Sequence, residues 1–290
     1  MSISRINARS IRARLAQSNA HPTPLKAMLD AICIAAYFGL SAWFWPGLPG
    51  CCRTDWLPRL LPTLPLIPHL VLLHRDMLGA DGIHLGFALS LSAVSALTVL
   101  AYATAAWRYH LAGMFAFVLA FAGFSVVLQS LMPLGDPIQH TDAPLFRAHL
   151  LVAFSAYSLL TIAALHALLI ALAEKHLHKA VPPKMLAGLP PLLTMEKLLF
   201  RMLEAGFALL TMTLISGIGF SEEVFGKALT LNHKSVFGIA AWCIFAALLV
   251  GRRAYGWRGR TAIYWTLAGF SSLVLAYAGV KFVMEVLLGR

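Results

Sequence analysis

Long uninterrupted runs of apolar residues dominate the chain and determine its predicted architecture. A membrane-spanning helix needs roughly 20 mostly apolar residues, because the hydrocarbon layer is ~30 Å thick and a helix rises ~1.5 Å per residue. The runs show no alternation with a period of two, so they favour helices over the strands of a barrel. We predict an all-α, polytopic transmembrane helical bundle with about eight spans: 27–46, 59–78, 84–105, 112–132, 148–172, 200–218, 233–251 and 261–287.

The second run is the least regular of these. Pro62, Pro65 and Pro68 interrupt it, and His69 and His74 lie within it. Proline is tolerated in membrane helices where neighbouring groups satisfy the freed backbone. We therefore expect this span to be the most distorted.

Composition supports a membrane protein over a soluble one. Hydrophobic residues make up 59% of the 290 residues, charged residues make up only 12%, and the mean hydropathy is +0.76. Soluble domains carry about 25% charged residues. A chain this poor in charge cannot cover a water-facing surface, so membrane lipids are its expected surroundings.

The basic residues of the loops predict an orientation. Cytoplasmic connections of membrane proteins are enriched in Lys and Arg. Most basic residues after the first span fall in or beside the connections 47–58, 106–111, 173–199 and 252–260, whereas the alternate connections are poorer in Lys and Arg and richer in acidic residues. This asymmetry predicts that both termini lie outside. It also explains the net charge of +11 without a nucleic-acid partner.

The first 26 residues contradict that orientation. They form a basic extension with four arginines and Lys26 but no acidic residue, ahead of a transmembrane domain at 27–290. Three explanations stay open: a misassigned start with translation beginning at Met28, a basic and disordered tail on the membrane surface, or a transit-like peptide. The connection 173–199 has room for a short surface helix but not for a further domain.

Enzyme motifs are missing from the sequence. The four cysteines form no C-x-x-C or C-x-x-C-H pattern, and there is no phosphate-binding loop, G-x-S-x-G or H-E-x-x-H. We expect no catalytic residues and no enzymatic activity.

Eleven histidines are an unusual number for such an apolar chain. In the predicted orientation His149 and His233 begin spans at the outer face, and His74, His84 and His140 lie near the same face. Neutral imidazole ligates haem iron, so His149 and His233 are candidate axial ligands. The other three fit headgroup positions, where histidine is merely tolerated, which leaves His74 and His84 as weak candidates for cofactor binding.

Other polar residues within the predicted spans have structural explanations. His69 and His166 lie deeper, and we expect both to hydrogen-bond between helices, as we expect for Gln129. Lys281 and Glu285 are spaced to pair along the last span. The basic and aromatic segment 251–260 suits anionic lipid headgroups at the inner face.

Three segments resemble a known family. The stretch RAHLLVAFSAYSLLTIAALHALLIAL begins at Arg147 and resembles the segment that opens with a periplasmic histidine in the cytochrome c assembly protein family. These are haem-handling integral membrane proteins of the CcsA and HemX type. PPLLTMEKLLFRMLEAGFALLTMTLISG resembles the following span, and the sequence from Leu231 onwards resembles the last two. The similarity is greatest to the small YpjD-like inner-membrane branch.

The resemblance implies a function. Members of the family take up haem from the cytoplasmic side and present it to apocytochrome c at the outer face of the bacterial inner membrane. They use periplasmic histidine ligands and a tryptophan-rich segment between two spans. His149 matches one of these histidines. The implied role is non-covalent haem binding in cytochrome c biogenesis, with cytochrome c assembly proteins or apocytochrome c as partners.

This chain departs from the family pattern at two places. Segment 219–235 stands where the tryptophan-rich motif belongs but contains no tryptophan, and Lys234 is the best match to its charged end. A second flanking histidine after the last span is also missing, so His233 is a substitute argued from position alone. The alternative is an accessory subunit of another inner-membrane complex, such as a divalent-cation transporter, that has lost the haem role.

Overall fold

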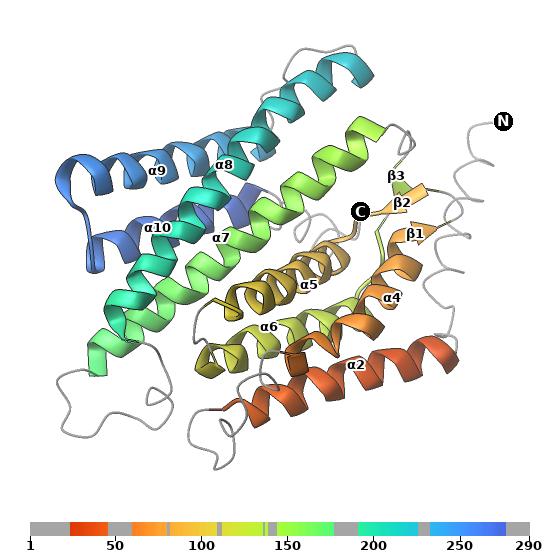
Figure 1. The fold of residues 1–290 in the computed structure, drawn as a ribbon. Coiled ribbons are helices and arrows are strands. Elements are labelled where there is room, and N and C mark those ends of the chain that lie inside the picture. The colour runs from red at the N-terminus through yellow and green to blue at the C-terminus, as the bar shows by residue number, and fades with distance from the viewer. Residues whose placement is uncertain are drawn as a thin grey trace.

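We analysed a computed structural model of the chain. The structure describes residues 24–45, 60–79, 82–108, 112–135, 137–138, 144–176, 191–225 and 233–276. Almost all of these residues are helical, which confirms the all-α class (Figure 1). The helices are α2 (Pro24–Trp43), η1 (Leu61–Thr63), α4 (Leu66–Met77), α5 (Phe87–Ala106), α6 (Ala112–Leu131), α7 (Pro144–His176), α8 (Leu192–Phe225), α9 (His233–Tyr255) and α10 (Arg260–Val274).

Six helices in the described part of the chain are long and apolar enough to cross a membrane, by length and composition. They are α2, α5, α6, α7, α8 and α9, and each covers most of a predicted span. The predicted number of eight is not confirmed. Fifteen residues of α10 are described, and the rest of the eighth predicted span, with Lys281 and Glu285, lies outside the described residues.

The second predicted span is interrupted, as its prolines indicated, and it is not among the six helices long enough to cross a membrane. It consists of the 3-10 turn η1 followed by α4, which has 12 residues and is therefore ~18 Å long. Pro62 lies in η1 and Pro65 caps the N-terminus of α4. The prolines break the helix because they remove backbone donors and restrict φ.

Helices α7 and α8 are longer than predicted, at 33 and 34 residues. Each is ~50 Å long, which exceeds the ~30 Å of the hydrocarbon layer, so both extend beyond it. Residues 192–199, expected to belong to a polar connection, are the first turns of α8.

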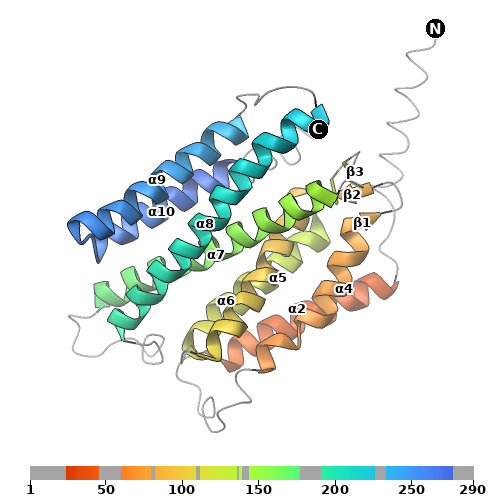
Figure 2. The same ribbon diagram turned by 45° about the horizontal axis from the view of Figure 1, so that its top comes forward.

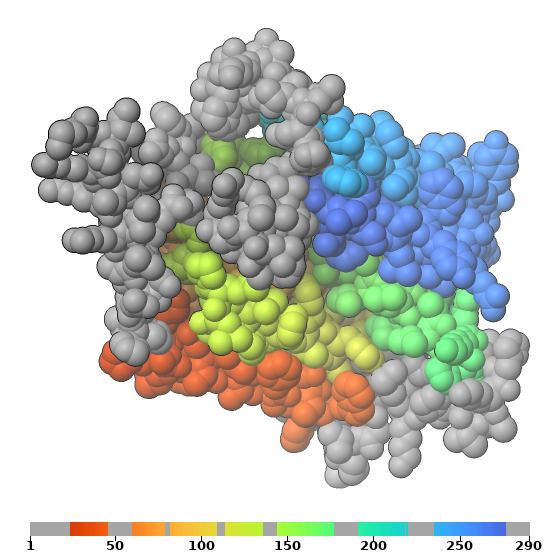
Figure 3. All heavy atoms as spheres, turned by 180° about the vertical axis from the view of Figure 1, so that it is seen from behind, coloured from red at the N-terminus to blue at the C-terminus, as the bar shows by residue number. Residues whose placement is uncertain are grey.

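The helices form two groups of four. In the first group α2 packs on α4 and α6, and α5 packs on the same two helices. In the second group α7 packs on α8 and α10, and α9 packs on the same two. The contact of α5 with α7 joins the groups, and α7 runs between α5 and α8 (Figure 2). In the space-filling view α2 and the pair α9–α10 occupy opposite sides of the molecule (Figure 3).

A small antiparallel sheet lies at one end of the first group. We call this the outer end, following the predicted orientation, because α2 begins and α4 ends there. Strand β2 (Gly82–His84) pairs with β1 (Leu78–Gly79) and with β3 (Pro137–Ile138). The sheet joins the α4–α5 turn to the segment between α6 and α7. Sequence analysis did not predict it, because two- and three-residue strands carry no hydrophobic periodicity.

The backbone at Gly86 closes this junction. Its N–H donates to the carbonyl of Leu134 at 2.8 Å. A Cβ atom at Gly86 would lie only 2.5 Å from that same carbonyl oxygen. Glycine is therefore required here by the close approach of two backbones.

Replacing Gly86 by alanine should destabilise the protein by roughly 1–3 kcal/mol, because two backbone segments must separate. The matched control is Gly39→Ala in α2, where no atom lies within 4 Å of an added Cβ. That change should stabilise the helix by roughly 0.5–1 kcal/mol. Thermal unfolding in detergent measures both; equal midpoints for the two variants would contradict the close approach.

Candidate functional site

His149 lies at the outer end of α7 and is half-buried. Its Nδ1 atom shares a 2.8 Å hydrogen bond with the hydroxyl of Ser216 on α8. The bond crosses the α7–α8 interface near the point where both helices approach the outer end. A side-chain partner on one ring nitrogen fixes the orientation of an imidazole, as is common for histidines that ligate metals.

Apolar side chains lie near His149 along both α7 and α8. Gly217 follows Ser216, and a Cβ there would touch the His149 ring at 3.4 Å. Leu145, one turn before His149, is 48% exposed, and Met212, one turn before Ser216, is 54% exposed. This arrangement places an imidazole beside exposed apolar side chains, which suits a flat apolar macrocycle that needs an axial ligand.

His233 is the first residue of α9. Its side chain lies outside the described residues, so the structure gives only its place in the chain. Helix α9 packs against α8, where Gly238 approaches Leu214. His149 and the start of α9 therefore flank α8 toward the same end.

The two weaker candidates lie at the outer end of the first group. His74 is exposed in the last turn of α4. His84 is in β2, and its Nδ1–H donates to the carbonyl of Gly135 at 2.9 Å. His84 is thus fixed to the segment after α6, whereas His149 is fixed to α8. His140 lies outside the described residues.

The deeper histidines differ from one another. His69 is fully buried and bonds to Tyr37 of α2 and Ser92 of α5, which confirms the predicted contact between helices. For His166 that prediction is wrong, because its Nδ1–H donates to the carbonyl of Ile162 in its own helix. Within the part of the chain described, no three His, Cys, Asp or Glu side chains gather as a metal site.

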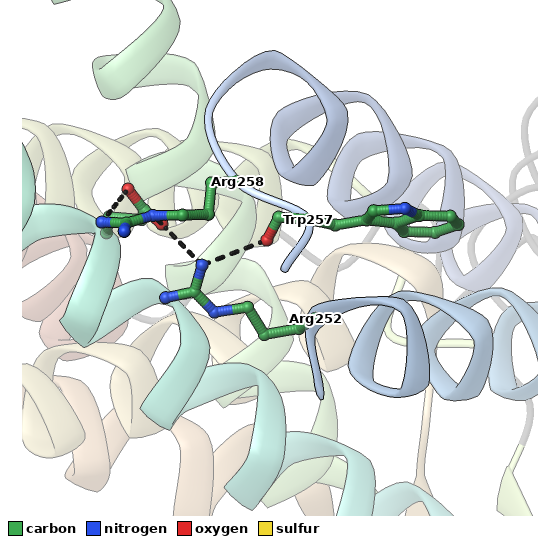
Figure 4. A network of polar contacts seen from close by, with 4 residues as sticks. Arg252, Trp257 and Arg258 are labelled. Carbon is green, nitrogen blue, oxygen red and sulfur yellow. Dashed lines mark hydrogen bonds and ion pairs between the residues drawn. The ribbon is translucent and has the colours of Figure 1, made fainter. Parts of the chain in front are cut away.

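The opposite, inner end carries a network of ion pairs (Figure 4). Glu196 of α8 accepts hydrogen bonds from Arg258 at 2.9 and 3.4 Å and pairs with Arg252 at 3.2 Å. Arg252 also donates to the carbonyl of Trp257 and lies 4.5 Å from the ring centre of Phe200. The network ties α8 to the turn between α9 and α10.

Two further pairs extend this network toward solvent. Arg253 lies 3.5 Å from Glu204, and Arg260 lies 3.9 Å from Glu174. The arginines of segment 251–260 contact glutamates of α7 and α8, whereas the contact of this segment with lipid headgroups stays a prediction. Sequence analysis missed these partners because they are more than 45 positions away along the chain.

The fold and its outer histidine define a class: a multi-pass helical membrane protein with a candidate cofactor ligand at one end. Comparison with known sequences identifies the family within this class. Residues 64–288 match the family described as Cytochrome C assembly protein, which is most of the chain. This protein belongs to the cytochrome c assembly protein family.

Several curated relatives support the assignment. The inner membrane protein YpjD of Escherichia coli is 31% identical over 209 residues, which cover 71% of this chain and 75% of that protein. An uncharacterized 28.8 kDa protein of Azospirillum brasilense is 35% identical over 141 residues, or 49% of this chain and 52% of that one. The cytochrome c biogenesis protein CcsA of Gloeobacter violaceus is 33% identical over 92 residues, or 32% and 27%.

No solved structure matches the chain significantly. The relatives, together with the six apolar helices, identify a multi-pass protein of the bacterial inner membrane.

We expect Glu196→Gln to destabilise the protein by roughly 1–2 kcal/mol, because Arg252 and Arg258 both lose their charged acceptor. The control is Glu204→Gln, whose side chain is 51% exposed and pairs with an Arg253 side chain that is 79% exposed. Exposed pairs contribute ~0–1 kcal/mol, so this variant should stay close to the parent. Denaturation in detergent measures the free energy of unfolding of both variants. A larger loss of stability for Glu204→Gln than for Glu196→Gln would contradict the prediction.

Proposed function

We propose that this protein binds haem non-covalently at its outer end and acts in cytochrome c biogenesis. The family assignment and the likeness to CcsA proteins support the biological process. The observation that carries haem binding is His149, oriented by Ser216 across the α7–α8 interface.

The residues around His149 fit haem. Haem supplies an iron that accepts an axial imidazole and a large apolar ring that leaves water for apolar surroundings. His149 would ligate the iron, Ser216 would hold the imidazole in place, and Leu145 and Met212 would cover the ring. His233 is the second candidate ligand, supported by the place of α9 beside α8.

The chain's own role in this proposal is binding and orientation. No bond-making residue is assigned, and the protein is proposed to be a haem-handling factor rather than an enzyme. Cytochrome c assembly proteins or apocytochrome c are the proposed partners. Presentation of haem without the tryptophan-rich segment would depend on other residues near the outer end.

Visible spectroscopy of the purified protein in detergent tests haem binding. After haem loading, the parent protein should show a Soret band that His149→Ala largely abolishes. Ser216→Ala should weaken haem affinity roughly 10–100-fold, because the ligand loses its orienting partner. The matched control is His176→Ala, at the opposite end of the same helix, where the ring bonds only to the Leu172 carbonyl among the described interactions.

Two outcomes would overturn the proposal. One is a parent protein without a Soret band after loading. The other is equal haem affinity for His149→Ala and His176→Ala. A haem-free protein that co-purifies with a stoichiometric membrane partner would support the accessory-subunit alternative, which the tryptophan-free segment 219–235 favours.

A further inference from the structure

The buried polar side chains of this protein are concentrated in one part of the molecule. Ten of the fourteen buried polar or charged residues in the described part of the chain lie on helices of the first group: Asp30, Ser41, His69, Asp76, Ser90, Ser92, Ser95, Thr98, Ser125 and Gln129. Ser158 and His166 lie on α7, which packs against α5. We define the polar column as these twelve residues without Ser41 and Ser90, together with Tyr37 and Tyr102. Lipid and apolar side chains offer such groups no partners, so their alignment needs an explanation.

The centre of the column consists of two hydrogen-bonded groups that together involve four helices. Tyr37 of α2 shares a 2.9 Å bond with Nδ1 of His69 on α4, and Nε2 of that ring shares a 2.8 Å bond with Ser92 of α5. One turn further, the Ser95 hydroxyl shares a 2.5 Å bond with Ser125 of α6. All five side chains are fully buried.

Toward the outer end the column reaches charged groups. Asp76 accepts hydrogen bonds from Lys26 at 2.8 Å and from Gln129 at 2.9 Å. Gln129 lies one helical turn from Ser125 on α6, so this cluster adjoins the centre of the column. Asp30 lies one turn from Lys26 on α2 and is 7% exposed.

Toward the inner end the column crosses to the second group. Thr98 of α5 donates to Ser158 of α7 at 3.2 Å. One turn further along α5, the Tyr102 ring faces His166 of α7, with ring centres 6.0 Å apart. Tyr102 lies ~6 Å from the inner end of α5.

The unpartnered atoms lie at the two ends of the column. Four buried side-chain atoms in the described part of the chain have no hydrogen-bond partner: Asp30 Oδ1 and Gln129 Oε1 at the outer end, and the Tyr102 hydroxyl and His166 Nε2 at the inner end. An unmet buried polar group costs about 1–3 kcal/mol, so such groups bind water where there is room.

The inner pair is chemically matched to a water molecule. Since His166 Nδ1–H donates to Ile162, Nε2 of the neutral ring is an acceptor, and the Tyr102 hydroxyl is a donor. A water between them would accept from Tyr102 and donate to His166. At the outer end, two unpartnered acceptor oxygens call for a donor, which water or a hydronium ion supplies.

We propose that the polar column is a proton path from the Asp30–Asp76–Gln129 cluster to the Tyr102–His166 pair. Hydroxyl and imidazole groups each accept a proton on a lone pair and release one to the next group, directly where they are hydrogen-bonded and through a water molecule where they are not, so a proton crosses without a net chemical change. Ser92, Ser95, Thr98 and Tyr102 lie on one face of α5 and span ~15 Å. Hydrogen bonds that merely join helices do not require this alignment along α5, nor do they require unmet polar groups at both ends of the column.

The test measures proton flux into vesicles made of phosphatidylethanolamine and phosphatidylglycerol at 3:1. Purified, haem-free protein is reconstituted with a pH-sensitive dye inside, and valinomycin with a potassium gradient sets the potential. We expect the parent protein to raise proton flux at least tenfold over protein-free vesicles. Because no haem is present, the result is independent of the proposed haem function.

Isosteric variants separate a proton path from packing. Thr98→Val removes a hydroxyl that bonds to both Val94 in its own helix and Ser158 of α7. Thr266→Val removes an equally buried hydroxyl that bonds to its own helix at Ala262 and lies outside the column. Thr98→Val should lower the flux at least tenfold, and Thr266→Val should leave it within twofold.

Specific results would overturn the proton path. These are a parent flux equal to that of protein-free vesicles, equal flux in the two variants, or equal conduction of sodium ions. Circular dichroism checks that each variant folds. If Thr98→Val does not fold, Ser158→Ala interrupts the same step and carries the same expectation.

Discussion

Apolar contact cannot decide by itself how these helices pair, because lipid tails solvate an apolar helix about as well as another helix does. Polar bonds between helices supply the missing selectivity, and His69 is the clearest case. Its ring joins α2 to α5 through Tyr37 and Ser92 while it belongs to α4. Any rotation of one of these three helices would leave a buried donor or acceptor unmet. The first helix group is therefore organised around one imidazole, and the second group is attached to it through α7.

The features that the sequence predicted are those encoded by neighbouring residues. Apolar runs located the six long helices, and the isolated polar residues His69 and Gln129 were correctly predicted to bond between helices.

Contacts between residues far apart in the sequence were not predictable. The arginines of segment 251–260 were assigned to topology and to lipid headgroups, since nothing in that segment indicates that Glu196 lies beside them. His166 resembled His69 in its surroundings along the chain, yet no acceptor or donor on α5 meets its Nε2 in the described residues. His149 was predicted as a candidate, whereas its partner Ser216 was not, because the register of α7 against α8 is a tertiary property.

Helix α7 contributes residues to both the proposed haem site and the polar column. At its outer end it presents His149 to α8, and along its length it presents Ser158 and His166 to α5. These faces point to different neighbours, so the proposed haem site and the polar column use separate surfaces of α7. The family match begins at residue 64 and so leaves α2 out, although α2 supplies Tyr37 and Lys26 to the column. The helix outside the family match therefore contributes to the interior of the first group.

The shortness of α4 has a consequence for how the chain is made. Twelve residues are too few to enter lipid as an independent span, and Asp76 in the last turn of α4 adds a charged group that raises the insertion free energy further. During synthesis α4 would insert into the membrane inefficiently unless α2 and α6 were already beside it to supply Lys26 and Gln129. Gln129 lies 53 positions after Asp76, so α4 must wait at the translocon, or at the membrane surface, until α6 has been made. Membrane integration of this protein is thus expected to proceed by groups of helices rather than one helix at a time.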